Sequence, residues 1–130
     1  MTVTSHTLVP DTTFGVPSGL YDGSSQDWYS EPVKAANYYR GQGHTQTCYF
    51  NLINFVGVIV IEATLQTWPG GADSPDYLTN DLWFEVARLG DPSSIMTEYR
   101  PITVLGNFTW LRARILDFSA GQIRAVTVVY

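Results

Sequence analysis

The stretch from Phe55 to Leu65 is apolar at nearly every position. Valines occupy one parity of an extended strand, and isoleucine, alanine and leucine occupy the other. Successive side chains of a strand point to opposite faces, so only a strand that is covered on both faces tolerates this pattern. The pattern therefore predicts a central strand of a β-sandwich over residues 55–65.

Two residues within this stretch carry expectations of their own. Gly57 indicates a place where backbone or a large side chain approaches the strand closely. Glu62 is the exception to the apolar pattern, and an unpaired carboxylate in a covered strand costs free energy. We expect Glu62 either to lie at the rim of the sheet or to meet a basic side chain, for which Arg112 and Arg114 are candidates.

The remaining pattern after residue 40 predicts strands and turns. Strands are expected over residues 44–52, 82–86, 95–105, 108–118 and 123–130, and the breaker residues between them are Asn54, Gly90–Ser94, Gly106-Asn107 and Ala120-Gly121. Pro101 places its strand at a sheet edge or at a bulge. No segment has a helical period beyond one or two turns.

The last two strands are expected to form a hairpin. With Ala120-Gly121 as its two-residue loop, the facing pairs are Asp117 with Arg124, Ile115 with Val126, and Ala113 with Val128. This register makes one face apolar throughout and places opposite charges at the tip. The fold class that follows is all-β, with a single antiparallel, jelly-roll-like β-sandwich over residues 41–130.

Residues 1–40 differ from the rest of the chain because they are rich in Gly, Pro, Ser, Thr and Asp. They predict an irregular N-terminal arm with one possible short strand between Thr2 and Val9. Disordered segments are poor in aromatic residues, yet this arm contains Phe14, Tyr21, Trp28, Tyr29, Tyr38 and Tyr39. We therefore expect an extended, ordered arm that lays these six rings, our candidate interface, on its own sandwich or on a neighbour. A long loop packed on its own domain is an equally good interpretation.

Composition narrows the classes of function. The chain has 130 residues, of which 45% are hydrophobic, 14% aromatic and 15% charged, which indicates one domain with extensive protein contacts. The net charge of −5 and the lack of a basic cluster argue against nucleic-acid binding. No apolar run approaches a membrane span, and the first residues have neither the basic head nor the apolar core of a secretory signal.

Candidate chemical sites are few. His44 and Cys48 share a parity, but residues four apart on a strand are separated by about 13 Å, so we expect a buried structural cysteine. The acidic loop over residues 73–81 matches no calcium-loop signature and is interpreted as solvated. No catalytic residue, cofactor or metal is expected, and a single cysteine excludes an internal disulfide.

A candidate face for a ligand or partner comprises Trp68, Tyr77, Arg112 and Arg114. The two aromatic residues lie on loops and could stack on sugar rings. The two arginines are expected on one exposed sheet face, where they could bind an anion, a sugar or a partner's carboxylate. Ordinary solvated positions, or a role as partner of Glu62, are the alternative for the arginines.

Several segments together resemble small virion structural proteins of contractile-tailed bacteriophages. They are Gly19-Leu20-Tyr21-Asp22-Gly23, Asn37-Tyr38-Tyr39, His44-Thr45, residues 55–65, Leu82-Trp83-Phe84-Glu85-Val86 and residues 106–115. The resemblance covers residues 19–130 and implies a short, sandwich-like particle component. Two departures are the loop over residues 68–81, which is longer than the usual connection, and the first eighteen residues, which match no part of the family. No binding residues are carried over.

The expected function is a non-enzymatic structural subunit of the virion, in the tail, baseplate or neck. Its partners would be other virion proteins and copies of itself, with the arm over residues 1–40 bridging neighbours and the sandwich over residues 41–130 as the folded body. One alternative is a capsid decoration or cement protein. Another is a carbohydrate-binding sandwich module that contacts host glycans.

Overall fold

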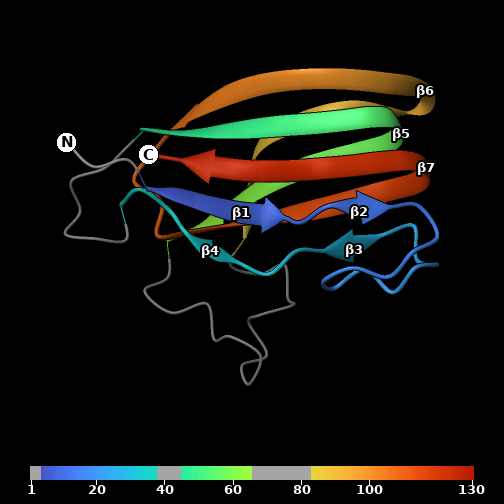
Figure 1. Ribbon diagram of the computed structural model, residues 1–130. Helices are drawn as coiled ribbons and strands as arrows, with labels where there is room; N and C mark the ends of the chain where they lie inside the picture. The colour runs from blue at the N-terminus through green and yellow to red at the C-terminus, as the bar shows by residue number, and fades with distance from the viewer. Residues whose placement is uncertain (1–3, 38–44, 66–82) are drawn as a thin grey trace.

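The computed structural model describes residues 4–37, 45–65 and 83–130, and in these residues the chain is all-β. The strands form one antiparallel sheet of seven strands with the order β1-β7-β5-β6, and the short strands β2, β3 and β4 also pair with β7 (Figure 1). Their bounds are β1 Ser5–Val9, β2 Thr12–Thr13, β3 Trp28–Tyr29, β4 Val33–Lys34, β5 Thr45–Thr64, β6 Phe84–Leu105 and β7 Trp110–Val129. The predicted all-β, sandwich-like fold class is confirmed.

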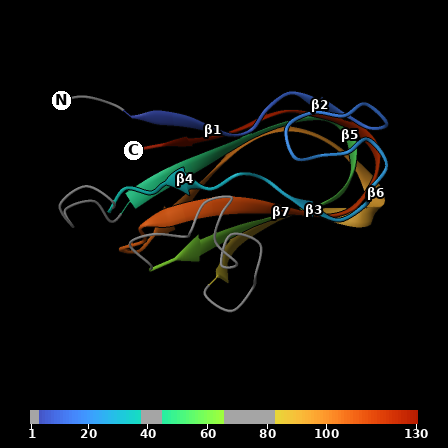
Figure 2. The same cartoon turned by 90° about the horizontal axis from the view of Figure 1, so that it is seen from below.

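The three long strands each turn back near their middle, so that one continuous sheet supplies both layers of the sandwich (Figure 2). One layer contains β1 and β2 with the first half of β5 and the second halves of β6 and β7. The other contains β3 and β4 with the second half of β5 and the first halves of β6 and β7. Register shifts in β5 and β7 mark the bend, as expected of bulges that bend a strand.

The predicted hairpin is wrong. Residues 110–129 form one strand, in which Ile115 lies opposite Ile59 rather than Val126. Gly121 does adopt a positive φ of 89°, but it lies at a bend within one continuous strand and not in a two-residue turn. The reason is that β5 pairs with β7 on both sides of the bend, so the ladder continues around it. The turns predicted at Asn54 and at residues 90–94 are likewise bends, within β5 and β6.

Glycine is required where the strands bend against one another. A Cβ on Gly121 would lie 2.1 Å from the Asn54 carbonyl oxygen, and a Cβ on Gly90 would lie 2.3 Å from the Gly57 carbonyl oxygen. A Cβ on Gly57 itself would lie 3.0 Å from both the Phe55 ring and the Leu116 carbonyl oxygen. The close approach predicted at Gly57 is therefore confirmed.

The hydrophobic core lies between the two layers. Every side chain from Val58 to Thr64 is buried, which confirms that this part of the central strand is covered on both faces. The apolar residues assigned to the hairpin do face the core, since Ala113 and Val128 are both fully buried. They do so from opposite layers, and not as cross-strand neighbours.

Residues 4–37 lie along β7 of the same chain. The short strand expected before Val9 is β1, which pairs with the second half of β7. The intervening loop is irregular but hydrogen-bonded, because Asp22 Oδ1 accepts bonds from the backbone N–H groups of Ser24 and Ser25. These bonds lower the pKa of Asp22 to about 2. The segment therefore closes the open side of its own sandwich.

Candidate functional site

In the described residues, the outer face of the layer that contains β1 has uncharged side chains at the ladder positions of four adjacent strands, and the exposed Arg124 lies at its margin, at the β7 bulge beside Ala125. The uncharged residues lie opposite one another in the ladders, while the alternating residues Cys48, Phe50, Val126 and Val128 fill the core. We call this surface the neutral face; its residues are Ser5, Thr7, Thr45, Thr47, Tyr49, Asn51, Tyr99, Pro101, Thr103, Leu105, Ala125, Thr127 and Val129. Hydroxyl, amide and aromatic groups dominate it.

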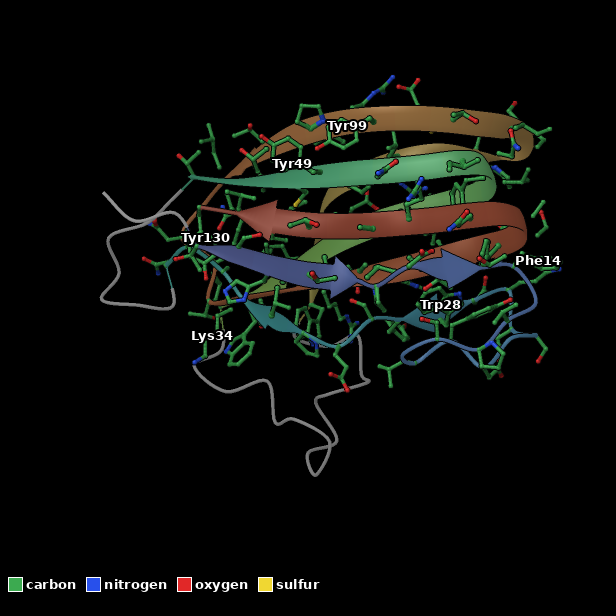
Figure 3. The ribbon with its side chains drawn as sticks, in the orientation of Figure 1. Phe14, Trp28, Lys34, Tyr49, Tyr99 and Tyr130 are labelled. Atoms are coloured by element: carbon green, nitrogen blue, oxygen red, sulfur yellow. The ribbon has the colours of Figure 1, made fainter. Side chains whose placement is uncertain are left out.

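Two tyrosines stand together on the neutral face. The ring centroids of Tyr49 and Tyr99 are 6.2 Å apart with the planes tilted by 36°, and Figure 3 shows them on the neighbouring strands β5 and β6. Tyr99 is 71% exposed. With Asn51 and Thr127 the rings border a shallow depression of about 350 Å³. The arrangement is an aromatic ledge beside neutral hydrogen-bonding groups.

The neutral face ends at β6, the outermost strand of the sheet. Among residues 4–37, 45–65 and 83–130, nothing pairs with the far side of β6. Its exposed side chains include Ile95, Tyr99 and Leu105. On the opposite side of the strand Arg100 Nη2 lies 3.3 Å from Glu98 Oε1, and both side chains are well exposed. We use the name β6 edge for the backbone edge of residues 96–105 that faces away from β5.

Arg112 does not lie on an exposed face, so that prediction is wrong. Its side chain has no exposed surface, and its Nε donates a hydrogen bond of 2.8 Å to Glu62 Oε1. The guanidinium is held between two rings, 4.2 Å from the Tyr29 centroid and 4.4 Å from the Trp83 centroid. The prediction that Glu62 meets a basic side chain is confirmed.

Arg114 lies at the margin of the same cluster. Its Nη1 is 3.9 Å from Glu62 Oε2, its side chain is partly exposed, and its guanidinium is 5.7 Å from the Tyr29 centroid. A buried ion pair that is also stacked on aromatic rings satisfies its own charges. The cluster is therefore a structural element of the covered layer.

The aromatic residues of the candidate interface take different positions. Tyr21 and Trp28 are buried and pack against Phe118 in the core. Phe14 lies edge-on to Phe118 and is 44% exposed, at one end of the molecule (Figure 3). Tyr29 covers Arg112. The remaining candidates lie outside the described residues; they are Tyr38, Tyr39, Trp68 and Tyr77.

A second depression lies between β1 and the segment that carries β3 and β4. It measures about 320 Å³, and most of its lining is apolar, with Leu8, Leu20 and Trp28 among the contributing residues. Within the described part of the chain, the buried Nε1 of Trp28 has no hydrogen-bond partner.

Cys48 is buried, as predicted, and burial raises the pKa of its thiol to about 12. The thiol therefore stays protonated and weakly nucleophilic near neutral pH. His44 lies outside the described residues, as does the acidic loop over residues 73–81. No cluster of three or more His, Cys, Asp and Glu side chains occurs in the described ranges, and no helix there is long and apolar enough to cross a bilayer.

Sequence reasoning missed the neutral face, although a signal was present. Between Thr45 and Leu52 every second residue is Thr, Tyr or Asn, and the alternate residues are buried. This alternation predicts a strand, and the register of the neighbouring strands is needed to show that the outward neutral residues continue across them.

Comparison of the chain with protein-family models gives no match, and comparison with curated proteins gives no relative.

Proposed function

We propose that this chain is a non-enzymatic structural subunit of a phage particle, which contacts its neighbours through the neutral face and the β6 edge. The observation that supports this proposal is that the residues of the neutral face are uncharged over parts of four strands, with Arg124 at the margin. A contact between proteins must remove water from both surfaces, and removing water from charged groups is costly. Tyrosine, which combines a large apolar ring with a hydroxyl, is favoured at such contacts.

The virion role also draws on the resemblance of residues 19–130 to virion proteins of contractile-tailed phages. On this proposal the tail, baseplate or neck is the location, and a capsid decoration protein is the alternative. The contact surface is assigned differently from the sequence-based expectation. Residues 4–37 pack on their own sheet, so the neutral face takes the part that was expected of the arm. Among the candidate rings within residues 4–37, Phe14 is the exposed one.

The test uses a photoreactive benzoylphenylalanine placed at Tyr49 in the full chain. We expect the chain in purified particles, and we expect light to cross-link this position to a virion protein that mass spectrometry identifies. A matched variant carries the same group at Val16, which is exposed but lies outside the neutral face, and should give little product. Absence of the chain from particles, or cross-linking no better from Tyr49 than from Val16, would refute the proposal.

A second candidate function is binding of a neutral glycan, favoured by the ledge of Tyr49 and Tyr99. Aromatic faces stack on the apolar faces of sugar rings, while Asn51 and Thr127 offer hydrogen bonds to hydroxyl groups. The site differs from the one expected at Arg112, which is buried. Binding on a glycan array that is lost in Tyr49→Ala and retained in Phe14→Ala would favour this function. Absence of binding to every glycan on the array would rule out this second function.

A further inference from the structure

The β6 edge offers a regular row of unpaired backbone groups. From Glu98 to Leu105 the strand pairs with β5 without a register shift, while nothing in the described ranges pairs with its far side. Such an edge can accept another strand unless side chains prevent it. Charged residues and proline are the usual means of prevention, and β6 has Glu98, Arg100 and Pro101. The order of these residues along β6 therefore determines which strand can pair with this edge.

That order is self-complementary about Tyr99. In an antiparallel pair related by a two-fold axis at Tyr99, the residue at a given distance before it lies opposite the residue at the same distance after it. Glu98 then meets the second copy's Arg100, and the reverse pair forms as well. One step further on the same side of the strand, Met96 meets Ile102, and both are partly buried beside the core. Opposite charges and apolar groups thus face their complements.

Neighbouring registers do not share this property. An axis at Glu98 places the two copies of that carboxylate opposite each other, and an axis at Arg100 does the same for the guanidinium groups. Like charges directly opposite are destabilising across a strand pair. An axis at Thr97 or Pro101 leaves both charges opposite uncharged residues. Among these five axes the one at Tyr99 alone pairs both charges.

The outer side of the strand agrees with the same axis. On that face Tyr99 lies opposite Tyr99 of the second copy. The two Tyr49–Tyr99 pairs are then adjacent, and the two neutral faces form one surface. Proline is tolerated in an edge strand where its nitrogen faces away from the neighbouring strand, here β5. Backbone groups two residues apart point to the same side of a strand, so the N–H and C=O of Tyr99, two residues before Pro101, also face away from β5. The two copies of Tyr99 can then exchange both backbone hydrogen bonds. Pro101 lies opposite Thr97 of the second copy and has no N–H to donate, so the Thr97 carbonyl oxygen at that position is left to water.

We propose that this chain forms a two-fold symmetric dimer by antiparallel pairing of its β6 edges about Tyr99. The dimer names a second copy as one partner of the surface in the proposed function, and its biological role rests on that function. The pairing itself rests on the side-chain order of β6.

The experiment measures the mass of the full chain by light scattering and sedimentation over a range of concentrations. We expect a dimer for the wild type. Glu98→Arg opposes two arginines at each of two symmetric positions and should weaken the dimer about tenfold or more. Arg100→Glu should do the same. The double variant Glu98→Arg/Arg100→Glu exchanges the charges and should recover the dimer, because it restores both cross-strand pairs.

The matched control is Glu85→Arg. It also reverses an exposed carboxylate of β6 that pairs with an arginine, Arg88, but no residue of β6 lies opposite it in the proposed register, so the dimer should be unchanged. Circular dichroism and thermal unfolding of every variant establish that it is folded. A wild type that is monomeric at all concentrations would overturn the proposal. So would a dimer that neither Glu98→Arg nor Arg100→Glu weakens, or a double variant that does not regain the dimer. Cross-linking from Tyr49 in particles is scored separately, so the proposed function can survive a monomer.

Discussion

The two halves of β5 belong to one strand but to different environments. In the half from Thr45 to Leu52, side chains alternate between buried and at least partly exposed, whereas in the half from Val58 to Thr64 all are buried. The first half covers the core with one face and offers the other to solvent in the layer of the neutral face. The second half has both faces covered. A single sheet thus combines a stabilising region with a surface available for contacts.

The outward side chains explain the difference. In the covered half they include Glu62, and the neighbouring strand β7 supplies Arg112 opposite it, with Tyr29 and Trp83 over the guanidinium. In the open half they are short or neutral groups such as Thr47 and Asn51. An ion pair is therefore buried inside the covered layer, while the residues of the neutral face are uncharged, although charged residues usually lie at the surface. Four predictions test this comparison.

The largest effect is expected at the buried ion pair of the covered half. Arg112→Ala leaves Glu62 buried without its partner and removes the stacking on Tyr29, so the free energy of unfolding should fall by about 3–5 kcal/mol. Urea denaturation measures it. Arg88→Ala breaks the exposed pair with Glu85 and should leave the unfolding curve close to that of the wild type. With Glu62→Gln the loss should be less than additive; strict additivity would contradict the pairing.

A carboxylate introduced on the outer face of each half should lower the free energy of unfolding by different amounts. Val58→Asp places a carboxylate in the covered half, opposite Gly90 and Leu116 and so without an arginine across the strand, and should lower the free energy of unfolding by about 3 kcal/mol. Thr127→Asp places the same group on the neutral face, where water solvates it, and should cost about 1 kcal/mol or less. Equal losses in chemical denaturation would show that the two faces are not covered differently.

The bend that divides the halves depends on glycine. Gly121 and Gly15 have nearly the same φ, 89° and 88°, but a Cβ would strike the Asn54 carbonyl oxygen at Gly121 and would meet nothing within 4 Å at Gly15. Gly15→Ala should therefore cost about 1 kcal/mol from backbone strain alone. Gly121→Ala should cost about 2–3 kcal/mol. Thermal unfolding of the two variants side by side measures the steric part, and similar losses would argue against the close contact.

The smallest effect concerns reactivity and not stability. Cys48 faces the core from the open half, and its pKa of about 12 keeps the thiolate fraction very low at pH 8, so it should resist iodoacetamide until the protein unfolds. Thr45→Cys places a thiol at an exposed position of the same strand and should react readily in the folded protein. Rapid labelling of Cys48 in the native state would show that the layer opens more easily than its packing indicates.

The candidate site was only partly accessible from the sequence. The buried ion pair could be anticipated, since Glu62 interrupts an apolar strand and few basic residues exist to meet it. The neutral face could not, because its residues come from four strands, and only their register brings Tyr49 beside Tyr99. The assignment of Arg112 to an exposed face failed because the alternation of polar residues says nothing about what covers them.

The sequence by itself determined the extended conformation of the chain, the doubly covered stretch within residues 55–65 and the positions at which the strands change direction. Those properties are local, because side-chain alternation and positive φ at glycine act on the residues that carry them. The tertiary structure alone decided that Ala120-Gly121 bends a strand and does not close a hairpin. A bulge and a turn use the same residues, and the choice depends on whether a distant strand, here β5, continues the ladder past the bend.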